Sequence, residues 1–177
     1  MALEMRLERS DILTTVSVVS HGQLRLIEEL LRDLNRVGPE RIEVVLTLNL
    51  GNEQLPFDLQ HFSFPVTILR NIEPRGFGAN HNAAFAACKG QYFCVVNPDI
   101  RIKADPFAPL IRCLESGRAG LVGPLVKNSN GDIEDNARDF PTPWGIVKKL
   151  FAGRTAQPPG VSRGNDRPDW IAGMFML

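Results

Sequence analysis

Residues 75–99, RGFGANHNAAFAACKGQYFCVVNPD, contain a glycine turn, a helix of small residues, a strand and a polar tip. The strand Tyr92–Val96 is apolar until it reaches Asn97-Pro98-Asp99, as expected of a strand that is buried on both faces. In open α/β sheets, ligands bind beyond the carboxyl ends of the strands. The stretch therefore predicts an α/β fold with a ligand site at this tip.

Asp99 can be interpreted either as a turn residue or as a ligand-binding residue. Asn-Pro-Asp is good turn chemistry, because proline fixes φ and Asn or Asp bonds to nearby backbone groups. However, Gly76 and Gly78 flank Phe77 where an expected strand, 66–69, gives way to a helix. Such a turn lets backbone N–H groups approach a phosphate closely. Two ligand-facing features at one sheet edge favour a binding site.

Several motifs occur in the order found in a known family: Asn71-x-Glu73-x-x-Gly76-Phe77-Gly78, His81-Asn82 and Asn97-Pro98-Asp99. Together they closely resemble the family 2 inverting glycosyltransferases, in particular the rhamnosyltransferase-like branch. The resemblance runs from about residue 15 to the last residue. It implies a GT-A fold, a Rossmann-like and mostly parallel sheet with flanking helices, with Asn-Pro-Asp in place of the family's DxD motif. Asp99 would then hold Mg²⁺ or Mn²⁺ on the diphosphate of a nucleoside-diphosphate sugar.

The resemblance also implies the roles of residues near the donor. Relatives carry an Asp at the end of the second strand, where this chain has Leu48, so that only Asn49 is left to contact the nucleoside. Plain solvation is an alternative for His21 and Arg75, as is a core position for Trp170. The predicted donor-binding residues are Ser20, His21, Asn49, Arg75, Gly76, Phe77, Gly78, Asn82, Asn97, Asp99, Trp170 and Gly173.

Length and spacing predict a single domain over residues 1–177. We expect a nucleotide-sugar-binding core over 12–125 and a partial acceptor-side region over 126–177. The segment 152–168 is rich in Gly, Pro, Ser, Arg and Asp, which predicts a flexible loop. Relatives continue beyond the position of Leu177 into a segment that carries the general base. We therefore expect a chain truncated at its C-terminus, with the base beyond Leu177.

Composition excludes several partners and compartments. The 20 Lys and Arg residues balance the 20 Asp and Glu residues, so bulk charge does not indicate nucleic acid or an anionic membrane. Three cysteines without a CxxC pair predict neither a disulfide framework nor a zinc site. No apolar leader follows Met1 and no run is long enough to cross a bilayer. We expect a cytoplasmic protein, and peripheral association with the inner face of a membrane stays open.

Hydrophobic periodicity and turn residues locate the remaining elements. Strands are expected at 13–19, 41–48, 65–69, 92–96, 119–122 and 169–174. Helices are expected at 24–34, 79–87 and 106–114, with a short one at 144–151. Asn130-Gly131-Asp132 is the clearest hairpin turn in the chain.

Three functions remain in competition. The first is transfer of a sugar, with rhamnose as the first candidate, to a glycan or lipid-linked acceptor with inversion. The second is a non-catalytic module that binds nucleotide sugars or a partner, favoured by Leu48 and by the absence of a matched base; turnover would discriminate the two. The third is a dinucleotide-binding oxidoreductase, which fails because His81 occupies the position of the third glycine.

Overall fold

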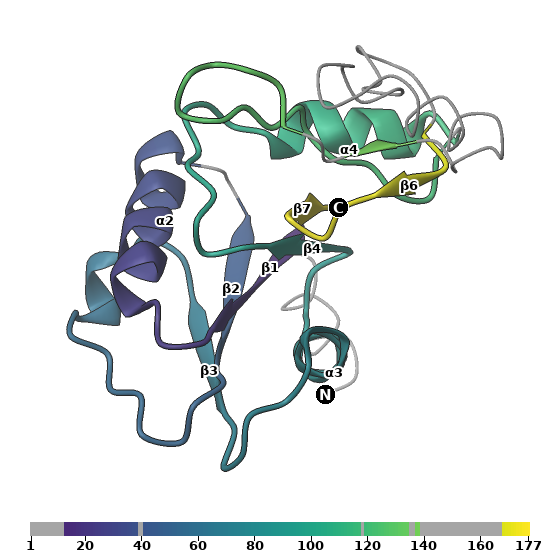
Figure 1. Ribbon diagram of the computed structural model, residues 1–177. Helices are drawn as coiled ribbons and strands as arrows, with labels where there is room; N and C mark the ends of the chain where they lie inside the picture. The colour runs from purple at the N-terminus through teal and green to yellow at the C-terminus, as the bar shows by residue number, and fades with distance from the viewer. Residues whose placement is uncertain (1–12, 39–40, 118, 135–136, 139–167) are drawn as a thin grey trace, which may run out of the picture.

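The computed structural model describes residues 13–38, 41–117, 119–134, 137–138 and 168–177 (Figure 1). The helix expected at 144–151, and all but the last residue of the loop expected at 152–168, lie outside these residues. Among the described residues, no helix is both long and apolar enough to cross a membrane.

A five-stranded sheet forms the centre of the fold, with strand order β3-β2-β1-β4-β7. The first four strands are parallel and β7 pairs with β4 in the antiparallel sense. The bounds are β1 Thr14–Ser20, β2 Ile42–Leu48, β3 Val66–Arg70, β4 Tyr92–Val96 and β7 Phe175–Met176. This arrangement confirms the predicted mostly parallel α/β sheet.

The helices connect these strands and cover the sheet. Their bounds are α2 Leu24–Val37, η1 Leu59–His61, α3 Phe77–Ala86 and α4 Phe107–Glu115. In Figure 1, α2 and α3 lie on opposite sides of the central strands, and α4 lies beside β6 and β7. Parallel strands need such crossover connections, which bury both faces of the sheet.

The two faces of the sheet differ in chemistry because neighbouring side chains of a strand point to opposite sides. On the α2 side, Val16 and Val18 of β1 join the leucines of α2 in one apolar core. On the other side, Ser17 of β1 bonds His81 of α3, and Thr15 bonds the buried Glu43 of β2. The apolar face therefore supplies most of the hydrophobic stabilisation, and the α3 face holds buried polar groups that need specific partners.

Two strand predictions are wrong in detail. Residues 119–122 form no strand, although the backbone groups of Val122 and Leu177 exchange hydrogen bonds of 2.8 and 2.9 Å. Gly120, Gly123 and Pro124 surround Val122, and such residues do not extend a ladder.

Of the strand expected at 169–174, only Trp170–Ile171 forms a strand, and β7 begins just beyond the expected range at Phe175. β6, Trp170–Ile171, pairs with β5, Ala137–Arg138, whereas β7 pairs with β4. A turn at residues 173–174 separates β6 from β7, because glycine ends the extended run there.

The predicted hairpin at Asn130-Gly131-Asp132 is confirmed. The N–H of Asn128 donates to the carbonyl of Asp132 at 2.9 Å, and Lys127 pairs with Ile133. Gly131 has φ +88°, a conformation that favours glycine.

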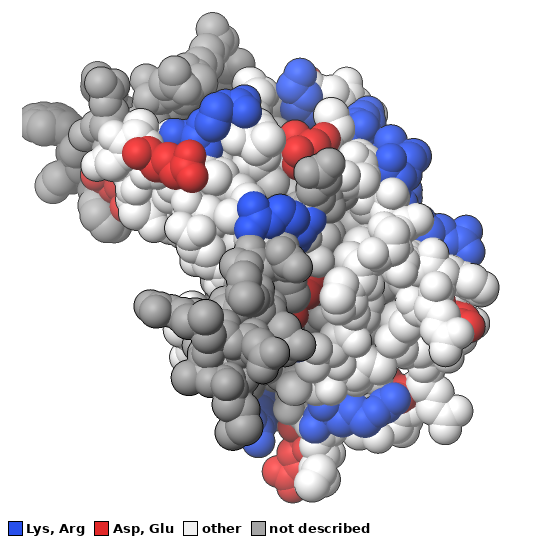
Figure 2. All heavy atoms as spheres, turned by 180° about the vertical axis from the view of Figure 1, so that it is seen from behind, with Lys and Arg blue, Asp and Glu red and all other residues white. Residues whose placement is uncertain are grey.

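Figure 2 shows acidic and basic side chains both scattered over one face of the molecule, in agreement with the balanced charge of the sequence.

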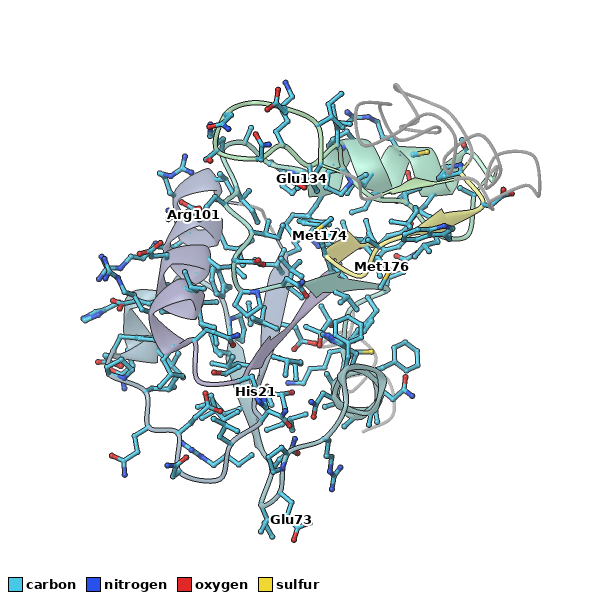
Figure 3. All side chains as sticks on the ribbon, in the orientation of Figure 1. His21, Glu73, Arg101, Glu134, Met174 and Met176 are labelled. Carbon is cyan, nitrogen blue, oxygen red and sulfur yellow. The ribbon has the colours of Figure 1, made fainter. Side chains whose placement is uncertain are left out.

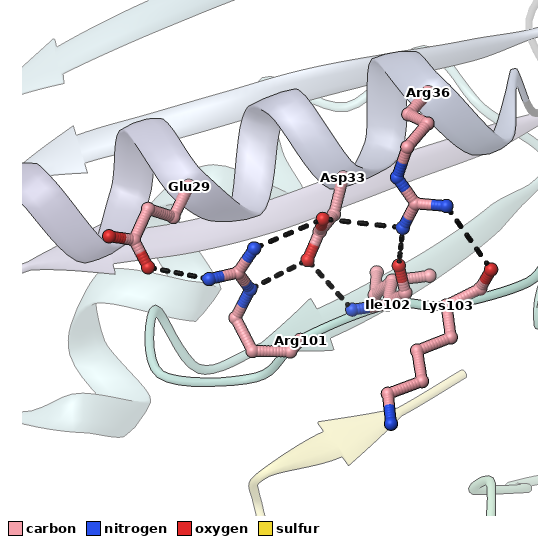
Figure 4. Close-up of polar contacts among 6 residues, drawn as sticks. All are labelled: Glu29, Asp33, Arg36, Arg101, Ile102 and Lys103. Carbon is pink, nitrogen blue, oxygen red and sulfur yellow. Dashed lines mark hydrogen bonds and ion pairs between the residues drawn. The ribbon is translucent and has the colours of Figure 1, made fainter.

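A charged cluster fixes α2 to the segment that follows β4 (Figure 4). The carboxylate of Asp33 accepts hydrogen bonds from Arg101 at 2.7 and 3.2 Å and from the N–H of Ile102 at 3.1 Å. Arg36 donates to the same carboxylate at 3.3 Å. The Arg101 guanidinium is the main cause that lowers the pKa of Asp33. Because Arg101 is two residues from Asp99, this cluster also holds the segment 97–99 that follows β4.

We predict that Asp33→Asn lowers the free energy of unfolding by about 1–2 kcal/mol at pH 7, because the charge that organises the cluster is lost. Urea unfolding would measure this. The folded pKa of Asp33 lies below its ordinary 3.8, so the contribution is present above that pH and disappears as the pH falls through the folded pKa.

The matched control is Glu28→Gln, which removes an ion pair with the exposed Arg32 and should cost less than about 0.5 kcal/mol. Equal losses in the two variants would contradict the role assigned to Asp33.

Candidate functional site

The carboxyl ends of β1, β2 and β3 meet at one edge of the sheet, next to the turn that leads into α3. Figure 3 shows His21, which follows β1, and Glu73, which follows β3, toward this end of the molecule. Extending the register of β1 and β4, in which Ser17 pairs with Val95, brings Asn97 level with Val19. Polar residues thus follow the carboxyl ends of four parallel strands, the end of the sheet where ligands bind in α/β folds.

An asparagine network, made of Asn49, Asn71 and Asn80, holds the turn before α3. Asn71 Nδ2 donates to Asn49 Oδ1 and to Asn80 Oδ1, both at 2.7 Å. The N–H of Arg75 donates to Asn49 Oδ1 at 2.8 Å, and its carbonyl accepts from Asn49 Nδ2 at 3.1 Å and Asn80 Nδ2 at 3.0 Å. Both backbone groups of Arg75 are therefore fixed.

The side-chain amide of Asn49 has no donor or acceptor left unused in this structure. Its amide carries two donors and two acceptor positions, and its remaining donor reaches His21 Nδ1 at 3.1 Å. Asn49 is buried, and Leu48 lies fully buried in the apolar core. In this structure the side-chain amide of Asn49 is bonded to protein partners and positions its neighbours, and its contact with a nucleoside stays a prediction.

Glu53 is a buried residue of this edge that the sequence analysis did not identify. Its carboxylate accepts from the hydroxyl of Ser20 and from the N–H groups of Gly22 and Leu50, the last two at 2.9 Å. It thereby ties the end of β1 to the end of β2. Ser20 is buried and its hydroxyl is used in this contact. The sequence indicates this role of Glu53 only by its place: it is an acidic residue shortly after a strand end, where its carboxylate can accept hydrogen bonds from the N–H groups of a turn.

The glycine turn is open to solvent. Gly76 caps α3 with φ −68°, and a Cβ atom added to Gly76 or Gly78 would meet nothing within 4 Å. Neither packing nor backbone conformation requires glycine at these positions. The first N–H groups of α3 lack helical partners and carry partial positive charge. The side chains of Arg75 and Asn82 are exposed beside them.

Asp99 lies on a turn that is attached to the sheet. The N–H of Asn97 donates to the carbonyl of Met174 at 2.9 Å, and that of Ile100 donates to the carbonyl of Asn97 at 3.2 Å. Asp99 is exposed, and the described residues include no group of three His, Cys, Asp or Glu side chains that could hold a metal. One exposed carboxylate does not form a protein cage, but it fits a hard cation that takes its other ligands from phosphate and water.

His81 fills the space between α3 and β1. Its Nδ1 lies 2.8 Å from Ser17 Oγ, and its ring centroid lies 4.4 Å from that of Phe77. Burial lowers the pKa of His81 from 6.5 to about 4, so the ring is neutral at pH 7. His81 thus packs α3 on the sheet, whereas its neighbour Asn82 faces solvent.

Phe77 and Gly173 lie in contact, because a Cβ atom on Gly173 would be 2.8 Å from Cζ of Phe77. Phe77 is nevertheless half exposed, and Trp170 is partly exposed. The structure thus brings the predicted site residues into two groups. One joins Ser20, His21, Asn49 and Arg75 by hydrogen bonds, and the other joins Phe77 and Gly173 by packing.

Comparison with known proteins agrees with this geometry. The family described as "Glycosyl transferase family 2" matches residues 15–164. No curated protein sequence matches the chain.

Solved structures with the same fold include a mannosyltransferase, PcManGT, from Pyrobaculum calidifontis, in complex with GDP-Man and Mn²⁺. It is 22% identical, with a TM-score of 0.57 over 65% of this chain and 35% of its own. Residues 1–349 of S. aureus TarS are 16% identical, with a TM-score of 0.59 over 72% of this chain and 41% of theirs. A longer TarS structure is 17% identical, with a TM-score of 0.61 over 72% of this chain and 24% of its own. The chain thus spans well under half the length of these proteins.

We predict that His81 makes folding stability depend on pH between 6.5 and 4. In this window the unfolded chain binds a proton that the folded chain excludes, so stability falls as the pH falls. The full effect is about 3.4 kcal/mol, at about 1.36 kcal/mol for each pH unit between 6.5 and 4. Urea unfolding at several pH values would show a smaller loss for His81→Asn than for the wild type.

The control is His61→Asn, because His61 is exposed on η1 and its replacement should leave the pH dependence unchanged. Parallel curves for the wild type and His81→Asn would contradict the prediction.

Proposed function

Because the chain belongs to glycosyl transferase family 2, we propose that it binds a nucleoside-diphosphate sugar at the carboxyl edge of its sheet for transfer of the sugar. One observation supports this placement most strongly. The fold leaves open space over Gly76 and Gly78, at the start of a helix whose leading peptide is fixed by the asparagine network. The start of a helix favours an anion such as a diphosphate, because its first N–H groups lack partners and carry partial positive charge. The family match also argues against the third candidate function, that of a dinucleotide-binding oxidoreductase.

The diphosphate would face three sources of positive charge or hydrogen bonds. These are the first N–H groups of α3, the guanidinium of Arg75 and the exposed amide of Asn82. A guanidinium presents a fork of donors that suits phosphate. Since the fold fixes the backbone of Arg75 and leaves its side chain exposed, Arg75 has the freedom to close on a ligand.

Asp99 would hold Mg²⁺ or Mn²⁺ together with the diphosphate, with Asn97 shaping the turn. When bound, the ion would supply positive charge against the charge that develops on the leaving diphosphate. The PcManGT structure, in complex with GDP-Man and Mn²⁺, supports this assignment by analogy.

On the acceptor side, the contact between Phe77 and Gly173 is the candidate wall for the sugar, together with the partly exposed Trp170 of β6. We propose transfer with inversion to a glycan or lipid-linked acceptor, with rhamnose as the first donor sugar to test. No described residue is assigned the role of general base.

A second candidate is a module that binds nucleotide sugars without turnover. The observation that favours it is the end of β2, where Leu48 is buried and the amide of Asn49 is fully used. An assay for sugar transfer discriminates the two functions, because both predict nucleotide binding.

We predict that UDP or dTDP binds in the presence of Mn²⁺ and that Asp99→Asn weakens this binding at least about tenfold, because the ion loses its protein carboxylate. Calorimetric titration with and without Mn²⁺ would measure the change. Asp132→Asn, an exposed aspartate of the hairpin, is the matched control and should bind like the wild type. Binding that is indifferent to both Mn²⁺ and Asp99→Asn would contradict the assignment.

We also predict that Gly78→Ala leaves the fold intact and weakens nucleotide binding. The added Cβ atom meets no protein atom, and alanine is favoured over glycine in a helix by up to about 1 kcal/mol. Stability would therefore stay equal or rise while affinity falls. Unchanged affinity in the stable variant would place the diphosphate elsewhere.

A further inference from the structure

We propose that His21 recognises the nucleobase of the donor through its Nε2–H group, and so selects bases with an oxygen at position 4 of a pyrimidine or position 6 of a purine over bases with an amino group there. This rests on the proposed function, which places a nucleoside diphosphate at this edge of the sheet.

The amide of Asn49 has only one orientation that satisfies its partners. The backbone N–H of Arg75 can only donate, so the atom 2.8 Å from it must be the oxygen Oδ1. The carbonyl of Arg75 can only accept, so the atom 3.1 Å from it must be the nitrogen Nδ2. A flipped amide would place oxygen against oxygen and N–H against N–H. The backbone of Arg75 therefore fixes which atom of Asn49 faces His21.

The orientation of Asn49 sets the proton position on His21. Asn49 Nδ2 lies 3.1 Å from His21 Nδ1, and an amide NH₂ group can only donate. Nδ1 must then accept and carries no proton. A neutral imidazole whose Nδ1 accepts holds its proton on Nε2. His21 thus presents a hydrogen-bond donor on the side of the ring away from Asn49.

His21 is exposed, yet its backbone is held in place. Its own N–H donates to Gln23 Oε1 at 2.9 Å, and the N–H of Gly22 donates to Glu53 at 2.9 Å. The ring is fixed at Nδ1 by Asn49. Because both the backbone and the ring of His21 are held by hydrogen bonds, its Nε2–H group loses little conformational freedom when a ligand binds. Such a donor suits recognition of a ligand better than plain solvation.

The position of His21 relative to the glycine turn matches the extent of a nucleotide. Asn49 Nδ2 lies 3.1 Å from both His21 Nδ1 and the carbonyl oxygen of Arg75, so these two atoms are no more than about 6 Å apart. A diphosphate seated beyond Arg75 at the start of α3 therefore leaves the nucleoside next to His21. Leu48 and Asn49 offer no competing group, since one is apolar and the other is fully bonded.

The polarity of the Nε2–H group determines which bases fit. Uracil and thymine carry an oxygen acceptor at position 4, and guanine carries one at position 6. Cytosine and adenine carry amino donors at the corresponding positions, which would face a donor without a partner. A site that leaves polar groups unpaired discriminates against the ligand that causes it.

Two matched pairs of nucleotides test the proposal on the whole chain with Mn²⁺. UDP and CDP differ at position 4 and in the hydrogen on N3, and IDP and ADP differ at position 6 and in the hydrogen on N1, while the ribose and diphosphate stay the same within each pair. For the wild type, calorimetry should show that UDP binds about 3- to 10-fold more tightly than CDP, or IDP than ADP, depending on which pair binds. This ratio corresponds to the free energy of one neutral hydrogen bond. His21→Phe, which keeps a ring without N–H, should reduce the preference to within about twofold.

His21→Gln provides rescue, because its amide can donate and should retain part of the preference. His61→Phe is the matched control for an exposed histidine and should keep the wild-type preference. Equal binding of the members of each pair, or a preference that survives His21→Phe, would overturn the role of His21 and leave the donor site standing. Failure of all four nucleotides to bind the folded chain would overturn the donor site, and this inference with it.

Discussion

The site depends above all on the hydrogen bonds of one buried amide, that of Asn49. It joins the end of β2 to His21 after β1 and to the backbone of Arg75 before α3. Burying an amide is costly unless each of its donors and acceptors finds a partner, so the three segments are held in one relative arrangement. The open space over the glycine turn is a consequence, because the turn cannot collapse onto the strand ends while the Arg75 peptide is held.

The sheet divides two tasks between its faces. The α2 face is apolar, and the Asp33 cluster fixes its helix to the segment beyond the β4 tip. The α3 face carries polar pairs such as Thr15 with Glu43, and within the described part of the chain Thr47 Oγ1 is a buried side-chain oxygen without a hydrogen-bond partner. Polar pairs contribute less to stability than apolar burial but specify one geometry, which suits a helix that begins at the proposed donor site.

Periodicity was enough to predict β1, β2, β4 and α2, because runs of β-branched residues and evenly spaced leucines reflect burial directly. The position of Asp99 followed from the rule for strand ends. The roles of Asn49, Glu53 and His81 were not predictable, since each depends on at least one partner 26 to 64 residues away that only the fold brings near. For the same reason the separate pairing of β6 with β5 and of β7 with β4 was not predicted, because the partner of a short strand depends on which segments the fold places beside it.

Paramagnetic broadening by Mn²⁺ in amide NMR spectra, recorded with UDP or dTDP present, would show directly whether the carboxyl edge of the sheet binds the donor. If the carboxyl edge is the donor site, broadening should centre on Asp99 and extend to Gly76, Gly78 and His21, while signals of the solvent-facing side of α2 stay sharp. Broadening centred on the shallow pocket between α2 and η1, lined by Arg32 and His61 among others, would contradict it. So would broadening that does not depend on the nucleotide.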